Sequence, residues 1–290
     1  MDYLINLVVS GVVVGSLYGL VAMGFAMIYR ATGMVNFAHG EVIMLIAYSA
    51  FSLSQIPGLP TWVLLPMVVT LSMLIGAFLE WAFIRPMLGE SLFSRVMVTI
   101  GLAVVIRSLV ILFWGVEPMA FPQLFGAQVL DLGIVALYPG QVFSLAAMAI
   151  LTTFVWAFFR YSRLGIAMRA TSCSDSTALL MGVDVKRIGV LSWALSGGFA
   201  AFAGLSFCMM FSLQPEISHV GLRAFPASIL GGLDSVLGGA VGGILIGIAE
   251  NLAGGYLGHG LKEIAGFLLI IVVLMVKPYG LFGQREIERV

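Results

Sequence analysis

Long apolar runs alternate with short polar connections along the whole chain. The runs fall roughly at residues 4–29, 42–56, 61–84, 96–116, 142–159, 188–211, 223–250 and 264–276. A helix that spans a membrane needs about 20 apolar residues, so most of these runs are long enough, while the second and the last are short. The pattern predicts an all-α polytopic membrane protein with about eight transmembrane helices, forming a single domain over residues 1–290.

The seventh run, residues 223–250, does not fit one simple span. It is long for one helix, short for two, and interrupted at Gly231-Gly232-Leu233-Asp234 and again at Gly238-Gly239. We predict a discontinuous or re-entrant pair of half-helices here, because broken helices often border a permeation route. Gly231 and Gly232 therefore become candidates for a translocation pathway. A continuous, flexible glycine-rich helix is the alternative.

Positive charge is concentrated on every second connection. Connections 57–60, 117–141 and 212–222 contain neither Lys nor Arg. The connections after the first, third and fifth runs, and the tail, carry Arg30, Arg85, Arg95, Arg160, Arg163, Arg169, Lys186, Arg187, Lys277, Arg285 and Arg289. Cytoplasmic loops of membrane proteins retain Lys and Arg. The pattern therefore predicts an outside N-terminus and a cytoplasmic C-terminus, which requires 223–250 to return the chain to the outer side.

Composition supports the membrane class and argues against other classes. The chain is 61% hydrophobic and 10% charged, whereas soluble proteins are about 25% charged. Its zero formal net charge gives no reason to expect a nucleic-acid partner. No phosphate-binding loop, hydrolase or zinc-protease motif occurs, so we do not expect an enzyme, a metal site or a bound cofactor. Cys173 and Cys208 are expected to be a reduced pair.

Polar residues are dense just before the second apolar run. Asn36 could cap the short second helix, and Glu41 would fall in its first turn, where a carboxylate is favourable. His39 lies between them, but one histidine and one carboxylate are too few ligands for a metal site. A capping and packing role and a place on a translocation pathway are both open for Asn36, His39 and Glu41.

Arg107 lies in the middle of the run 96–116. An unpaired arginine at the centre of a spanning helix costs about 2.5–3.5 kcal/mol, so we expect it to face the bundle or a wet cavity. Glu80 and Glu250 are candidate partners. Arg107 could contact substrate or a gate, or it could form a buried ion pair that fixes helix register.

The connection 160–187 is the largest basic one. Ser174 or Asp175 could N-cap a short helix there, and Gly182 suits its C-terminal end. The apolar face of this helix, formed by Ala178, Leu179 and Met181, is too small for a domain but fits a groove on another protein. We predict a docking helix; a plain loop is the alternative.

Glycines also recur at helical spacing along two runs. One stripe comprises Gly11, Gly15 and Gly19, and the other comprises Gly239, Gly243 and Gly247. Small residues at this spacing allow helix backbones to approach closely in lipid. We predict helix packing within the chain, with a subunit interface as the less common alternative.

Several of these blocks resemble branched-chain amino acid ABC transporter permeases of bacteria, over nearly the whole chain and in the same order. The matching blocks are Gly15-Ser16-Leu17-Tyr18-Gly19-Leu20, residues 33–41, Met168-Arg169-Ala170, Met181-Gly182-Val183, Lys186-Arg187, residues 222–247 and Lys277-Pro278-Tyr279-Gly280-Leu281-Phe282-Gly283.

The resemblance implies a multi-pass permease of the bacterial inner membrane, embedded in the lipid bilayer. It implies a second homologous permease subunit, two cytoplasmic ATPase subunits that bind ATP and Mg²⁺, and a periplasmic substrate-binding protein. It places the ATPase contact on the loop Arg169–Arg187, with Arg169, Asp175, Leu179, Met181 and Gly182 as candidate residues.

Two functional hypotheses follow. The first is a permease subunit of an ATP-driven importer for branched-chain or other hydrophobic amino acids; similar permeases carry urea, short amides or aromatic acids. The second is a self-sufficient secondary carrier or channel in which His39, Glu41 and Arg107 relay protons or ions. The resemblance favours the first hypothesis.

Overall fold

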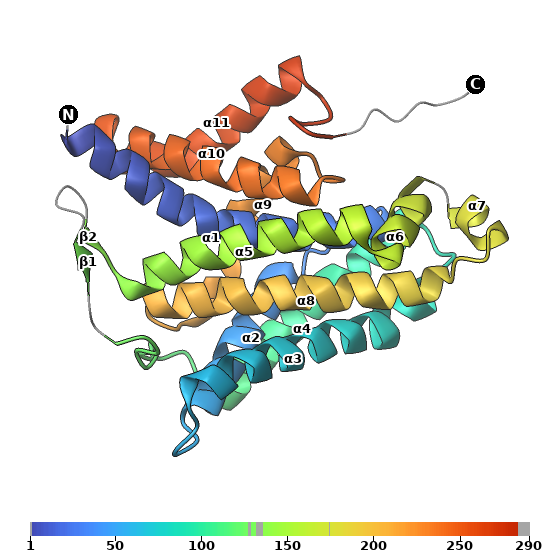
Figure 1. Cartoon of the computed structure of the whole chain (residues 1–290), viewed down its shortest axis with the longest axis horizontal. Helices are drawn as coiled ribbons and strands as arrows, with labels where there is room; N and C mark the ends of the chain where they lie inside the picture. The colour runs from blue at the N-terminus through green and yellow to red at the C-terminus, as the bar shows by residue number, and fades with distance from the viewer. Residues whose placement is uncertain (1, 127–128, 132–135, 174, 284–290) are drawn as a thin grey trace.

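Long helices lie side by side along the molecule, and shorter elements close its two ends (Figure 1). The computed structural model describes residues 2–126, 129–131, 136–173 and 175–283, without the side chains of 172, 173, 175–177, 259 and 263. Arg285 and Arg289 of the predicted basic tail, and Ser174 of the predicted cap, lie outside the described residues.

The helices are α1 (Asp2–Thr32), α2 (His39–Ser54), α3 (Thr61–Leu79), α4 (Leu92–Trp114), α5 (Pro139–Tyr161), α6 (Arg163–Cys173), α7 (Asp175–Leu180), α8 (Val185–Met210), α9 (His219–Gly231), α10 (Val236–Tyr256) and α11 (His259–Val276). A π-helical turn (Glu80–Ile84) and a 3₁₀ turn (Arg85–Met87) extend α3, and another 3₁₀ turn (Pro215–Ser218) precedes α9. Strands β1 (Leu130–Asp131) and β2 (Ala136–Leu137) pair antiparallel.

Within the described residues, six helices are long and apolar enough to cross a membrane. They are α1, α3 with its extension to Met87, α4, α5, α8 and α10. The predicted all-α, multi-pass architecture is confirmed at this level. The helices α2 and α9, with 16 and 13 residues, are too short to cross at about 1.5 Å per residue.

The two ends of the molecule carry different elements (Figure 1). The hairpin β1–β2, the α2–α3 connection and the start of α1 lie at one end, which we call the hairpin end. The helices α6 and α7 and the α3–α4 connection lie at the opposite end, which we call the α7 end.

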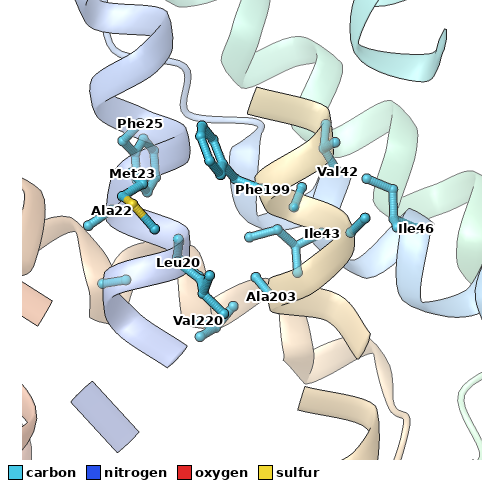
Figure 2. Packing of buried hydrophobic residues seen from close by; sticks show 14 of the residues in the cluster. Leu20, Ala22, Met23, Phe25, Val42, Ile43, Ile46, Phe199, Ala203 and Val220 are labelled. Carbon is cyan, nitrogen blue, oxygen red and sulfur yellow. The ribbon is translucent and has the colours of Figure 1, made fainter. Parts of the chain in front are cut away.

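The core is built around α1, whose side chains are buried almost continuously from Val13 to Ile28. α2 and α8 pack beside it, with Val42 and Ile43 of α2 close to Phe199 and Ala203 of α8 (Figure 2). The helices α3, α4 and α5 instead leave most of their side chains at least partly exposed.

The two glycine stripes pack against each other. A Cβ atom on Gly15 would lie 2.7 Å from the Cα of Ile244, and one on Gly243 would overlap the backbone of Gly19. Both stripes therefore serve packing within one chain, as predicted. Without side chains, α1 and α10 approach backbone to backbone, which supplies the van der Waals contact that drives helix association in lipid.

The chain is broken within the run 223–250, but at one place rather than two. α9 ends at Gly231 and α10 begins at Val236. The predicted second interruption, at Gly238-Gly239, is wrong, because both residues lie inside α10. Packing excludes a side chain at Gly238, because a Cβ there would overlap the carbonyl oxygen of Gly231.

Candidate functional site

The two short helices α2 and α9 meet at their N-termini. A Cβ atom on Gly221 would lie 2.8 Å from the Cα of Gly40, and a Cβ on Gly40 would overlap the carbonyl oxygen of Ser218. Only glycine allows this approach, which explains why residues 40 and 221 are both glycines. The contact joins two segments that are far apart in the sequence.

This contact lies at the level of the middle of α1. The ring of His39 lies against Gly24, where a Cβ would overlap its Nε2 atom, and Val220 of α9 packs near Leu20 (Figure 2). Leu20 and Gly24 are central in the buried, apolar stretch of α1. The starts of α2 and α9 therefore lie within the depth of the spanning helices, not at either end of the molecule.

Residues 33–38 form a non-helical entrance to α2. The buried side chain of Asn36 accepts a hydrogen bond at its Oδ1 from the Ala38 N–H, at 3.0 Å. The N-cap residue of α2 is Ala38, so the prediction that Asn36 itself caps the helix is wrong by two residues. Glu41 falls in the first turn, as predicted.

The side chain of His39 is packed inside the molecule. Its side chain is 1% exposed, and its ring meets that of Phe25 edge to face at 4.8 Å between centroids. Asn36 is equally buried. The His39 ring therefore packs α2 against α1, while Asn36 bonds the backbone at the entrance to α2, and both side chains are buried.

Ionisable side chains are exposed around the contact between α2 and α9. On α9 and the turn before it, Glu216, His219 and Arg223 are exposed, while Glu41 and Arg107 are partly exposed. The carboxylate of Glu216 acts electrostatically on Tyr48 of α2. We call the group Glu41, Arg107, Glu216, His219 and Arg223 the polar junction.

Arg107 has a carboxylate neighbour other than the predicted ones. Its guanidinium attracts the carboxylate of Glu41. The predicted partner Glu250 accepts a hydrogen bond from the Tyr18 hydroxyl at 2.9 Å. The other, Glu80, lies in the π-helical turn at the α7 end, with Oε1 3.0 Å from the position of a Cβ on Gly189.

The polar junction cannot face hydrocarbon at low cost. Each charged side chain at the centre of a bilayer costs about 2.5–3.5 kcal/mol on insertion scales, and charges there usually face a bundle interior or a water-filled cavity. This surface is therefore suited to water, a polar solute or another protein. Within the described residues, no group of three His, Cys, Asp or Glu side chains is placed to hold a metal ion.

The predicted pathway residues Gly231 and Gly232 lie apart from the polar junction. Both are buried where α9 ends, Gly231 against Gly238 of α10 and Gly232 against Gly283. The sequence-predicted pathway residues thus fall into three places: Asn36 and His39 inside the packing, Glu41 and Arg107 in the polar junction, and the glycine pair at the end of α9.

At the α7 end, consecutive apolar side chains point away from the molecule. Leu179, Leu180 and Met181 are 58%, 88% and 80% exposed. Ala178 is 3% exposed, so the prediction that it belongs to the outer apolar face is wrong. Arg169 of α6 is exposed. Asp175 begins α7, and its side chain lies outside the described part of the chain.

Gly182 ends α7 in the way its sequence position predicts. It has a φ of +82°, its N–H donates to the carbonyl of Leu179 at 3.0 Å, and the Val183 N–H donates to that of Ala178 at 2.9 Å. This pair of bonds is the Schellman motif. It satisfies the last carbonyls of α7 and fixes the exposed tip beside it.

Sequence reasoning missed four residues of these two surfaces. Leu180 was left out of the predicted apolar face, which comprised Ala178, Leu179 and Met181. Glu216, His219 and Arg223 were missed because their position depends on the fold-back before α9. A signal was present for Arg223, an arginine at the start of an otherwise uncharged stretch up to Asp234.

Comparisons with known proteins agree with this architecture. The protein family described as "Branched-chain amino acid transport system / permease component" matches residues 7–276. The high-affinity branched-chain amino acid transport permease LivH of Escherichia coli K12 is 32% identical, covering 99% of this chain and 98% of LivH. BraD of Pseudomonas aeruginosa, with the same description, is 31% identical, covering 97% and 96%.

Among solved structures, PsaBC from Streptococcus pneumoniae, in complex with Fab, has a similar fold. The TM-score is 0.50 at 14% identity, with 96% of this chain and 93% of that chain covered. The likeness supports the fold alone. With the family match over most of its length and full-length relatives above 30% identity, this chain belongs to the family of branched-chain amino acid transport permease components.

Proposed function

We propose that this chain is one of two permease subunits of an ATP-driven importer for branched-chain or other hydrophobic amino acids in the bacterial inner membrane. Its partners would be a homologous permease, two cytoplasmic ATPase subunits that bind ATP and Mg²⁺, and a periplasmic substrate-binding protein. The observation that carries the proposal is the exposed apolar tip of α7 on a chain of the permease family.

The proposed topology puts the hairpin end outside and the α7 end in the cytoplasm. Two features support it. The start of α1, the α2–α3 connection and the hairpin β1–β2 lie at the hairpin end and contain neither Lys nor Arg, whereas the basic connections α3–α4 and α5–α8 belong to the α7 end (Figure 1). The six long helices would cross the membrane completely, and α11 would bring the chain back to the cytoplasmic side. The short helices α2 and α9 start within the membrane and would cover only part of its depth.

The proposed coupling runs through α7. Its tip consists of Leu179, Leu180 and Met181, which are more than half exposed in the described part of the chain. Apolar side chains in water favour burial against a partner by about 1.5–3 kcal/mol each. A groove on an ATPase subunit would cover them, and movement of the ATPases would then tilt α8, which follows α7 directly.

The proposed route for substrate runs along the polar junction, on the face of this chain that a second permease would cover. Charged groups of both signs at this depth give a weak, transient polar contact for a zwitterion. Strong binding is not needed there, because the binding protein would capture the substrate before delivery.

The test is uptake in the complete importer with Leu179→Asp and, separately, Met181→Asp. A charge in an apolar groove costs enough to weaken docking by about tenfold or more. We expect intact permease in the membrane, reduced uptake and ATP hydrolysis that no longer follows uptake. Unchanged uptake in both variants contradicts the docking assignment.

A self-sufficient carrier is the second candidate, and the presence of the partly exposed Glu41 and Arg107 within the spanning region is the observation that favours it. It predicts that this chain alone transports solute in liposomes and that an uncoupler abolishes uptake at constant ATP. Transport that requires the ATPase subunits and survives the uncoupler excludes it.

A further inference from the structure

The segment after α11 folds back onto the end of α9. Residues 277–283 begin with a turn in which the Gly280 N–H donates to the Lys277 carbonyl at 3.0 Å. The Leu281 N–H then donates to the Leu230 carbonyl at 2.9 Å, and the Phe282 N–H donates to the Gly231 carbonyl at 3.1 Å. We call residues 277–283 the C-terminal clamp.

These bonds satisfy carbonyls that α9 cannot satisfy itself. The last four carbonyls of a helix have no donor within the helix. Of the residues that follow directly, Gly232 donates its N–H to the Ile229 carbonyl at 3.1 Å, and the chain then turns away toward α10, so the Leu230 and Gly231 carbonyls need donors from elsewhere. Leu281 and Phe282 supply the donors instead, from the far end of the sequence.

Glycines bring the clamp and α9 into backbone contact. Gly232 has a φ of +103°, and a Cβ on it would lie 2.6 Å from the Gly283 nitrogen. Gly280 has a φ of +78°, and a Cβ on it would lie 2.6 Å from the Ile229 carbonyl oxygen. Neither position accepts a side chain unless the clamp moves away from α9.

The other end of α9 carries part of the polar junction. His219 and Arg223 lie in its first two turns, and Gly221 touches Gly40 of α2. A helix of 13 residues behaves as a short rod of about 20 Å. A shift of the clamped end therefore also moves Arg223 relative to α2.

From this geometry we propose that the C-terminal clamp is a positioning element for α9. It ties α9 to the end of α11, so that the polar junction keeps the alignment transport requires and follows any movement of α11. The inference rests on the proposed function. It goes beyond a stabilising cap, because α9 is already packed on α10, where a Cβ on Gly242 would overlap the Ala227 carbonyl oxygen.

The experiment compares Gly232→Ala with Gly258→Ala in the complete importer. Gly258 has the same φ, +103°, but a Cβ there meets nothing within 4 Å. Both variants therefore place a side chain at the same positive φ, and only Gly232→Ala pushes the clamp off. The readouts are uptake per assembled complex and ATP hydrolysed per substrate transported.

We expect both variants to assemble and Gly258→Ala to transport normally. In Gly232→Ala, uptake per complex should fall by about tenfold, a loss typical of a displaced functional group, and ATP hydrolysed per substrate should rise. If Gly232→Ala only lowers the amount or melting temperature of the complex, or behaves like Gly258→Ala, the proposal is overturned.

A second pair tests the hydrogen bonds directly. Phe282→Pro removes the N–H that reaches Gly231, whereas Phe282→Ala keeps it and trims a side chain that is 54% exposed. Phe282→Pro should reproduce Gly232→Ala, and Phe282→Ala should not. If neither Gly232→Ala nor Phe282→Pro assembles, the clamp is needed for folding and the positioning role is rejected. A wild-type preparation without ATPase subunits contradicts the proposed function instead, whatever the variants do.

Discussion

The contact between α1 and α10 and the tip of α7 use small and apolar residues for opposite purposes. Along α1 and α10, side chains are absent where the backbones touch, as at Gly15 and Gly243. At the tip of α7, large side chains are present where the described part of the chain leaves them largely uncovered, as at Leu180, which is 88% exposed.

The difference identifies which surfaces are complete. Backbone contact between α1 and α10 leaves no room for a further partner, so substitutions there should act on folding. Leu179, Leu180 and Met181 at the tip of α7 are largely uncovered by the described part of the chain, so substitutions there should act on assembly and coupling. Variants in the two regions should therefore differ in whether they lower protein yield or uptake.

The largest effect is expected for Gly243→Leu. A side chain there must displace the backbone of Gly19, and overpacking against backbone costs about 3 kcal/mol or more, a large part of typical stability. We expect little monodisperse protein after detergent extraction, measured by gel filtration. The matched control is Gly101→Leu on α4, where a Cβ meets nothing within 4 Å. Equal yields of the two variants contradict the packing assignment.

The next largest effect is expected for Leu180→Asp, which should lower uptake rather than yield. Yield and melting temperature should match wild type, because the side chain is 88% exposed. Uptake by the complete importer should fall by about tenfold or more, since buried interface residues often contribute about 2 kcal/mol. Leu88→Asp is the control, at an exposed position of the α3–α4 connection. A loss of yield in Leu180→Asp would place this residue with the packing region.

The sequence predicted those features that depend on local spacing. Glycines four apart predicted close helix packing within the chain, which α1 and α10 show, and Gly182 predicted the end of α7, because these features depend on helical spacing and on backbone angles that only glycine adopts easily. The break after Gly231 lies within the segment that was predicted to be discontinuous.

Features that depend on distant segments could not be predicted. Gly238 and Gly239 look like helix breakers in sequence, but they lie within α10, where Gly238 accommodates the end of α9 and Gly239 the backbone of α1. The neighbour of Arg107 was missed because Glu41 approaches it only when α2 begins within the depth of the bundle. Hydropathy locates a span, but it does not say where along a neighbouring helix a short helix starts.

An intermediate effect is expected at the polar junction, which is neither fully packed nor fully exposed. Glu41→Gln and Arg107→Gln should each lower uptake by about three- to tenfold while leaving yield unchanged, equivalent to about 1 kcal/mol. Because the two charges attract each other, the double variant should lose less than the product of the single losses. Glu90→Gln, at an exposed position of the α3–α4 connection, is the control. Strictly multiplicative losses contradict the coupling.

The smallest effect is expected for Gly182→Ala. This variant allows a comparison between a glycine required by its backbone angle and a glycine required by packing. Unlike Gly243, Gly182 has open space around it, and only its φ of +82° requires glycine. Alanine at such an angle costs about 1 kcal/mol and should fray the end of α7 without affecting the spans. Uptake should fall about twofold, less than in Leu180→Asp. Gly182→Asn should recover much of the loss, because asparagine adopts this backbone conformation more readily. If Gly182→Asn is impaired as strongly as Gly182→Ala, the absence of a side chain rather than the backbone angle is required at position 182. The partner then lies closer to Gly182 than the exposed side chains of α7 alone indicate.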